Sequence, residues 1–417
     1  MRPFIPTILL LIQFGFSQKI LIPMDQAQKD HLKAYGTAYW ILNENINVEW
    51  ILNYRGGTFL IDSYPDVEQE CRVRGVSYEV IGAEQILAIY NEVEVNNMDV
   101  VLLEKAPKIA IYTPPGKQPW DDAVTLALTY AEIPYETLWD EEVFNGTLGQ
   151  YDWLHLHHED FTGQYGKFYK NYHNAVWYKN MEMQFNATAK KFGFPSVHEL
   201  KQQIAGKIKA YIQNGGFLFA MCSATDSYDI ALSMENVDGA HSVFDGTPLD
   251  PGLHSKLDYT LSLAFSGFKL LPDPMVYEFS DIDFPPSHNP VTRGAEADYF
   301  SLFEFSAKYD PVPTMLTQNH VIIVKGFMGQ TTGFHKDRIK NHIVIMGEDP
   351  ASDQVKYLHG NFGKGTFTFY GGHDPEDYQH FVGDPPTDLS LHRNSPGYRL
   401  ILNNILFPAA RKKERKT

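Results

Sequence analysis

The chain contains very little cysteine, no basic stripe and no long apolar run beyond its start. Its 417 residues include only two cysteines, which excludes a framework of several disulfides. The formal net charge of −16 argues against a nucleic-acid partner, because phosphate neutralisation requires clustered positive charge. No apolar run after the N-terminal segment is long enough for a transmembrane helix. We therefore expect a globular protein with no transmembrane segment and no nucleic-acid ligand.

Residues 1–18 have the pattern of a secretory signal peptide. Arg2 precedes an apolar run over residues 4–16, and Ser17 and Gln18 follow it. The run is too short to span a bilayer. We therefore predict an extracytoplasmic location, periplasmic or secreted, after signal cleavage.

The rest of the chain is too long for one ordinary core and predicts packed units of α/β class. Residues 19–105 alternate strands and helices, which predicts an N-terminal α/β unit with a parallel sheet. A second alternating unit covers residues 107–408, with an insertion at 235–345 whose composition predicts short strands and long loops. Residues 409–417 form a basic tail.

A lone cysteine lies where a buried strand is expected to end. The apolar segment 217–221 is followed by Cys222, and Ala220 and Ala224 are small enough to permit a sharp strand-to-helix turn. In open α/β sheets, active-site residues gather at the carboxyl ends of the strands. Three interpretations of Cys222 stay open: a reactive nucleophile, a buried inert thiol, or a disulfide with Cys71.

A second predicted strand, over residues 366–370, leads to a histidine and an acid. His373 follows a pair of glycines, and Glu376 comes three residues later. A thiol nucleophile requires such a base and such an orienting group. We therefore predict a catalytic triad of Cys222, His373 and Glu376.

Polar side chains also follow other predicted strands. His158 and Glu159 begin a loop that extends to Gln164, and this loop is expected to contact substrate and to help form an oxyanion hole. Arg55 lies in a glycine-containing loop after a strand of the first unit. It is a further candidate for substrate binding, although such a loop also suits a plain turn.

The histidines near the predicted strand ends raise the alternative of a metal. A site built from His158, Glu159 and His373 is sterically sensible. Histidines of a buried strand, however, more often hydrogen-bond within the core, and no fixed ligand spacing supports this set. No metal or other cofactor is therefore predicted. The remaining histidines of this group are His155, His157 and His359.

Two acids begin a predicted helix over residues 121–132. Asp121 and Asp122 also suit a sugar or peptide groove, but carboxylates at this position typically cap the helix. We therefore interpret one of them as the N-cap.

The motifs together resemble the class I glutamine amidotransferase-like superfamily. Residues 363–376, Gly-Lys-Gly-Thr-Phe-Thr-Phe-Tyr-Gly-Gly-His-Asp-Pro-Glu, together with Arg-Leu-Ile-Leu-Asn-Asn at 399–404, look like the end of a ThuA-type domain. The resemblance covers about residues 107–408 outside the insertion. It implies a flavodoxin-like parallel sheet, and it assigns the nucleophile, base and orienting carboxylate to Cys222, His373 and Glu376.

The whole chain also resembles secreted Bacteroidetes proteins that carry the label asparagine synthetase B. Residues 153–166, Trp-Leu-His-Leu-His-His-Glu-Asp-Phe-Thr-Gly-Gln-Tyr-Gly, are part of that resemblance. The true synthetase resembles an N-terminal-nucleophile glutaminase joined to an ATP pyrophosphatase, and neither part is matched by this sequence. The label therefore does not describe the expected chemistry.

These observations predict a cysteine-dependent hydrolase or amidase that acts on a small amide or a glycan-derived substrate. Aromatic residues make up 14% of the chain, which suits a carbohydrate-binding groove as well as a large aromatic core. One alternative is a non-catalytic binding or scaffold subunit with protein partners in the cell envelope. The other is a metal-dependent hydrolase.

Overall fold

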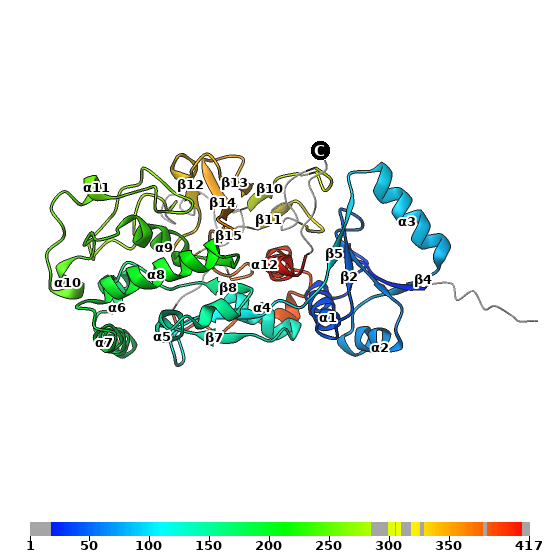
Figure 1. Cartoon of the computed structure of the whole chain (residues 1–417), viewed down its shortest axis with the longest axis horizontal. Coiled ribbons are helices and arrows are strands. Elements are labelled where there is room, and N and C mark those ends of the chain that lie inside the picture. The colour runs from blue at the N-terminus through cyan, green and yellow to red at the C-terminus, as the bar shows by residue number, and fades with distance from the viewer. Residues whose placement is uncertain are drawn as a thin grey trace, which may run out of the picture.

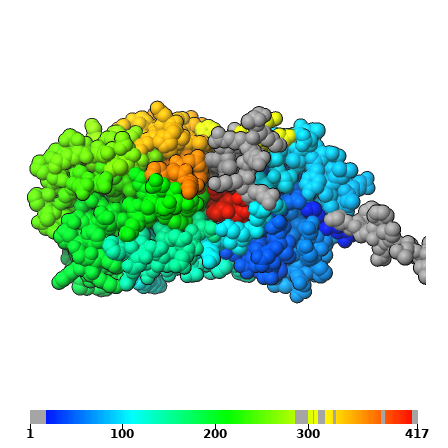
Figure 2. Space-filling model, viewed as in Figure 1, coloured from blue at the N-terminus to red at the C-terminus, as the bar shows by residue number. Residues whose placement is uncertain are grey.

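The computed structural model describes residues 18–284, 299–304, 306–309, 318–325, 329–377 and 382–410. All but the last residue of the predicted signal peptide, and the basic tail beyond Ala410, lie outside these residues. The described chain is a mixed α/β structure with one antiparallel and one mixed sheet. It is elongated, with the first sheet near one end (Figures 1 and 2). No helix in the described ranges is long and apolar enough to cross a membrane.

The N-terminal sheet is antiparallel throughout, so the predicted parallel sheet is wrong. Its strand order is β4-β1-β3-β2-β5, and each neighbouring pair runs antiparallel. The cause is a strand that alternation did not reveal: β2 and β3 follow each other directly through a hairpin turn at residues 53–57. Arg55, Gly56 and Gly57 there all adopt positive φ. The strands are β1 (Lys19–Ile22), β2 (Val48–Leu52), β3 (Thr58–Asp62), β4 (Glu79–Ile81) and β5 (Asp99–Leu103).

Three helices cover this sheet on its two faces. The helices are α1 (His31–Asn43), α2 (Pro65–Arg74) and α3 (Ala83–Val95). Buried side chains of α1 and α2 join one core, while those of α3 join a separate cluster on the opposite face. Both cysteines are buried and unbridged, and Cys71 lies on α2, so no disulfide links it to Cys222.

The second sheet combines a parallel half with an antiparallel half. The order is β11-β10-β13-β14-β15-β9-β8-β6-β7, with β12 paired to β14. Strands β15, β9, β8, β6 and β7 run parallel to one another, and every pair on the other side of β15 is antiparallel. The parallel strands are β6 (Ile109–Tyr112), β7 (Glu136–Leu138), β8 (Trp153–Leu156), β9 (Phe217–Met221) and β15 (Gly365–Tyr370). The others are β10 (Tyr299–Leu302), β11 (Ile323–Lys325), β12 (Phe334–His335), β13 (Val344–Glu348) and β14 (Gln354–Phe362). Strands of the predicted insertion therefore extend this sheet.

Helices cover both faces of the parallel half, which explains why β9 is apolar at every position. Phe217, Phe219 and Met221 face a core shared with α1, α4 and α12, whereas Leu218 and Ala220 face a second core with α8 and α9. The helices of the second unit are α4 (Ala123–Ala131), α5 (Asp140–Phe144), α6 (Tyr169–Tyr172), α7 (Val176–Lys191), α8 (Val197–Gln213), α9 (Ser223–Ser233), α10 (Ser242–Asp245), α11 (Leu253–Lys256) and α12 (Pro396–Leu406).

The last helix connects the two units. Helix α12 packs against both α1 and α4, and its Arg399 is fully buried. The Arg399 guanidinium donates hydrogen bonds to the carbonyl oxygens of Met24, at 2.7 Å, and Gly56, and to Tyr35 Oη at 3.1 Å. If the two units separated, the guanidinium N–H groups of Arg399 that donate these hydrogen bonds would lose their acceptors.

A buried carboxylate anchors the segment that follows α9. Asp229 accepts hydrogen bonds from the backbone amides of Leu263, Ala264 and Phe265 at 2.6–2.8 Å. This contact fixes part of the irregular insertion against the parallel half of the sheet.

Candidate active site

The carboxyl ends of three adjacent parallel strands bring the candidate residues together. In the register of the sheet, Leu156 of β8 lies beside Ala220 of β9, and Met221 lies beside Tyr370 of β15. The chain leaves the sheet immediately after these positions, so His157, Cys222 and the glycines before His373 emerge at one edge. Residues from distant parts of the sequence thereby meet where ligands bind in open α/β sheets.

Cys222 occupies a strained backbone conformation at the junction of β9 and α9. Its φ of 49° and ψ of −139° lie in a region that L-residues rarely adopt. Neighbouring contacts hold it there, since its amide donates to Gly372 O at 3.0 Å and its carbonyl accepts from Thr225 Oγ1 at 2.7 Å. Ala220 and Ala224 are completely buried beside this turn. The geometry is that of the strand-to-helix elbow that presents nucleophiles in several hydrolases.

His373 lies next to the Cys222 thiol. A methyl group placed on Gly329 would lie 3.0 Å from His373 Cβ and 3.2 Å from Cys222 Sγ, so both side chains border the same point. His373 Nε2 lies 3.2 Å from the carbonyl oxygen of Asp121 and 3.9 Å from its Oδ1. Asp121 therefore stands where a residue that orients the imidazole should stand.

Glu376 does not pair with His373. Its carboxylate lies 3.2 Å from His392 Nδ1, and its amide donates to Asp374 Oδ1 at 2.8 Å. The turn that Asp374 and Pro375 form carries the Glu376 side chain away from the imidazole. The structure thus brings together two members of the predicted triad and supplies Asp121 in place of the third.

The Cys222 thiol is enclosed by residues 329–332 from the end of the insertion. Only 1% of Cys222 is exposed, and burial raises the pKa of its thiol to about 11. Hydrogen bonds from the backbone amides of Thr331, Gln330 and Ser223 oppose this rise. In this arrangement the thiol is protonated at neutral pH and would require a base to react.

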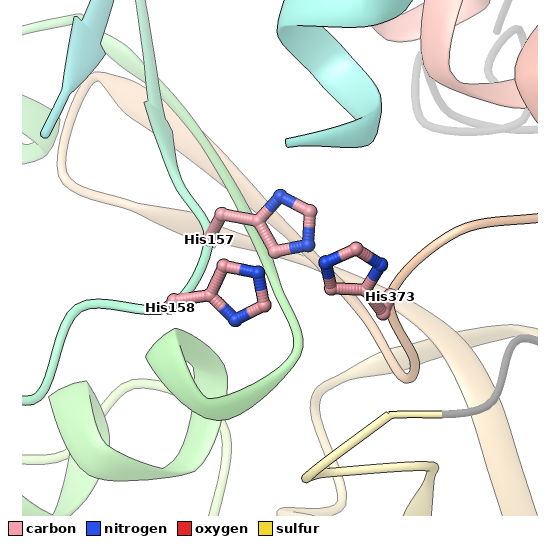
Figure 3. A group of neighbouring side chains, drawn as sticks. All are labelled: His157, His158 and His373. Atoms are coloured by element: carbon pink, nitrogen blue, oxygen red, sulfur yellow. The ribbon is translucent and has the colours of Figure 1, made fainter. Parts of the chain in front are cut away.

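Three imidazoles meet beside the same strand ends (Figure 3). The His157 and His158 rings stack with centroids 4.1 Å apart, and the His373 centroid lies 4.6 Å from the first and 4.5 Å from the second. One nitrogen from each ring lies within 4.8 Å of those of the other two. His157 and His158 can face each other because both follow the end of β8, where the alternation of strand side chains no longer applies.

One carboxylate holds two of the neighbouring histidines. Asp122 Oδ1 lies 3.2 Å from His157 Nδ1, and Asp122 Oδ2 lies 3.3 Å from His155 Nε2. Despite burial, these imidazoles hold the pKa of Asp122 well below its usual range, whereas burial lowers the pKa of His157. Asp122 also caps α4, accepting from the amides of Val124 and Thr125, as the sequence predicts.

The other residues predicted to bind substrate, apart from His158, do not all lie at the candidate site. Glu159 is buried at the site edge, where its carboxylate accepts from the His157 amide at 2.7 Å and where burial raises its pKa to about 7. Gln164 is buried and donates to Thr162 Oγ1 at 3.0 Å. Arg55 lies in the other unit, where it pairs with Asp25 and Glu79. It does not belong to this site.

A narrow aromatic pocket adjoins the histidines. His158 and Glu159 are part of its wall, and the His158 ring lies 5.4 Å from that of Trp120. Trp120 stacks on Phe168 with centroids 5.2 Å apart. The remaining lining residues include Trp139, Tyr165, Met181 and Phe185.

Sequence patterns did not reveal that Asp121 lies beside His373, that Asp122 lies beside His155 and His157, or that residues 329–332 lie close to Cys222. The acids were interpretable as caps, and one of them is a cap. His359, in contrast, lies within β14 with Nδ1 2.8 Å from Thr368 Oγ1, and it serves the core.

Comparison with known proteins gives little further guidance. No protein-family model matches the chain, and no curated protein matches it. Two cytoplasmic proteins of Salmonella typhimurium, STM3548 and STM1381, match 73% of this chain over 100% of their own at 11% identity, with TM-scores of 0.35 and 0.34. Gan42B, a GH42 beta-galactosidase from G. stearothermophilus, matches 65% of this chain over 28% of its own at 12% identity, with a TM-score of 0.28. Similarity at this level supports no functional argument.

Proposed function

We propose that the protein is a cysteine-dependent hydrolase of the amidotransferase-like type, with Cys222 as nucleophile and His373 as base. The observation that carries this proposal is the strained elbow of Cys222 beside His373 at the carboxyl edge of a parallel sheet. Strain of this kind costs on the order of 1–3 kcal/mol and typically persists at functional sites.

The strand order supports the amidotransferase-like fold. Counted along the chain, the parallel strands β6, β7, β8, β9 and β15 are arranged as 2-1-3-4-5. This is the flavodoxin-like order, in which ligands bind at the carboxyl ends of the central strands.

The chemistry follows from the positions of the groups. Asp121 O accepts from His373 Nε2, which leaves Nδ1 to take the thiol proton as sulfur attacks the carbonyl carbon of an amide. The C–N bond then breaks, His373 returns the proton to the departing amine, and water hydrolyses the thioester. The Ser223 amide, next to the thiol, is placed to stabilise the oxyanion.

The aromatic pocket supports a small amide or glycan-derived substrate. Trp120 and Phe168 offer flat apolar faces, while His158 and Glu159 supply polar groups in the wall of the same pocket. A signal peptide at residues 1–18 would place this activity outside the cytoplasm.

Alkylation of the native protein followed by peptide mapping tests the proposal. Cys71 is the internal control, because it is completely buried and burial raises the pKa of its thiol to about 12. We expect Cys222 to react at least tenfold faster than Cys71, by movement of residues 329–332, and to slow in His373→Ala. If both thiols remain unmodified until denaturation, the mechanism is wrong and a binding role becomes the better explanation.

A further inference from the structure

The three histidines beside the candidate nucleophile have the arrangement of metal ligands. His157 and His158 follow β8 and His373 follows β15, and these two strands of one sheet are separated only by β9. His157 and His373 are each 1% exposed, which is unusual for grouped imidazoles that serve no ligand. Figure 3 shows a nitrogen of each ring directed toward the space between them.

We propose that His157, His158 and His373 bind a divalent transition-metal ion of the Zn²⁺ class. The candidate ligand nitrogens already lie within 4.8 Å of one another. A zinc ion would lie about 2.0–2.1 Å from each nitrogen, so the rings would have to move closer together on binding, and three histidines leave one tetrahedral position for water or substrate. Neutral imidazole suits Zn²⁺ and its neighbours in the first transition row. The inference goes beyond the proposed thiol chemistry and does not depend on it.

Neighbouring acceptors orient two of the three rings as they do in zinc proteins. Asp122 Oδ1 lies 3.2 Å from His157 Nδ1, which turns Nε2 toward the cluster. Asp121 O lies 3.2 Å from His373 Nε2 and restricts the orientation of that ring. Within the described residues, His157 Nε2 has no hydrogen-bond partner even though it is buried. A ligating histidine almost always donates its other N–H to such an acceptor.

A second group, Asp122, His155 and His157, is less suited to hold the ion. Asp122 already accepts from two amides at the start of α4 and faces both imidazoles, and His155 Nδ1 lies 3.0 Å from Phe219 O. These contacts already use the polar atoms of Asp122 and His155. We therefore assign these two residues the role of orienting His157.

The proposed metal and the proposed hydrolysis both use the His373 imidazole. In the hydrolysis it would accept the thiol proton, and in the metal site it would bind the ion together with His157 and His158. Bound metal would hold the imidazole lone pair and prevent proton transfer from Cys222. Metal loading should therefore reduce the reactivity of Cys222.

Metal titration of the full-length, chelator-treated protein tests the inference. Calorimetry with Zn²⁺ and absorption spectroscopy with Co²⁺ are applied to wild type, His157→Gln, His158→Gln, Cys222→Ala and a control, His173→Gln. His173 is exposed at the end of α6, and its ring nitrogens contact Tyr169 O at 2.9 Å and Asn174 Nδ2 at 2.9 Å. We expect one ion per chain in wild type, Cys222→Ala and His173→Gln. We expect at least 100-fold weaker binding in the two cluster variants.

The spectra and a supporting variant separate the remaining explanations. Tetrahedral Co²⁺ bands without a sulfur-to-cobalt charge-transfer band indicate histidine ligands and no thiolate. Asp122→Asn should weaken binding by about 10–100-fold, because it removes the carboxylate charge that faces His157 Nδ1 and makes the ring a stronger ligand. Circular dichroism of the metal-free protein must show that each variant is folded. If a histidine variant does not fold, metal binding by Asp122→Asn is compared with that of wild type instead.

Three results would overturn the inference: no stoichiometric binding to wild type, unchanged binding in both cluster variants, or loss of binding in Cys222→Ala. If instead only the thiol mechanism is wrong, the results differ. Cys222 is then unreactive toward alkylation in the metal-free protein, while zinc still binds to Cys222→Ala. The two proposals can therefore fail separately.

Discussion

The backbone strain at Cys222 predicts an unusual response to glycine. Replacing alanine by glycine in a buried strand loses about 0.5–1 kcal/mol of backbone entropy and about 0.8 kcal/mol for the buried methyl group. At position 222 the same change should regain about 1–3 kcal/mol of strain, because φ is 49° and ψ is −139°. We therefore expect Cys222→Gly to be about as stable as Cys222→Ala, or slightly more stable.

The matched comparison is Ala220→Gly, two residues earlier in β9, where the side chain is equally buried. There the change should cost about 1.3–1.8 kcal/mol with no strain to relieve. Urea unfolding followed by fluorescence of the six tryptophans gives all four free energies of unfolding under one set of conditions. The two positions should differ by about 2 kcal/mol. An equal loss at both would refute the strained elbow and remove the main support for a nucleophile there.

Three further predictions concern buried charges. Lys201→Met should lower the free energy of unfolding by about 3–5 kcal/mol, because Asp140, 2.9 Å away and equally buried, loses its counterion. Adding Asp140→Leu to this variant should restore most of that free energy, as measured by urea unfolding. Burial, aided by the Arg399 charge, lowers the pKa of His31 from 6.5 to about 4, so below pH 6.5 the unfolded chain binds a proton that the folded chain does not. His31 should therefore contribute about 3 kcal/mol to the free energy of unfolding, fully present above pH 6.5 and lost as the pH falls toward 4. His31→Gln should flatten that part of the pH–stability curve. Asp229→Asn should speed proteolysis within residues 235–284 at least tenfold, because an amide cannot accept all three backbone hydrogen bonds.

Each of these has a result that contradicts it. A double variant of Lys201 and Asp140 no more stable than Lys201→Met would show that the loss is one of packing. An unchanged pH curve in His31→Gln would place the acid sensitivity elsewhere. Cleavage of Asp229→Asn at wild-type rate would mean that other contacts hold the insertion.

The sequence predicted the parallel half of the second sheet well, because its signals are local. Strand β9 spans the predicted residues 217–221. The first sheet was predicted with the wrong direction, since β3 follows β2 without a helix and alternation alone did not separate the two strands. Local patterns place elements reliably, whereas strand direction depends on the connection between them.

Prediction of the site residues also succeeded where the signal was local in the sequence and failed where it depended on contacts between distant residues. Cys222 and His373 could be predicted because each directly follows an apolar strand. Asp121 could not, because it follows a different strand and its contact with His373 joins residues 252 positions apart. Glu376 was chosen by its spacing from His373, but the turn at Asp374 and Pro375 directs it to His392. Spacing along a loop does not determine where a side chain points.

The position of α12 has a consequence for biosynthesis. Its Arg399 reaches carbonyl oxygens at residues 24 and 56, and its side chains complete a core that also contains α1 and α4. Neither unit can bury this surface until α12 has been synthesised. A nascent chain should therefore expose the apolar face of α1 throughout synthesis, and it should depend on chaperones until its last helix emerges.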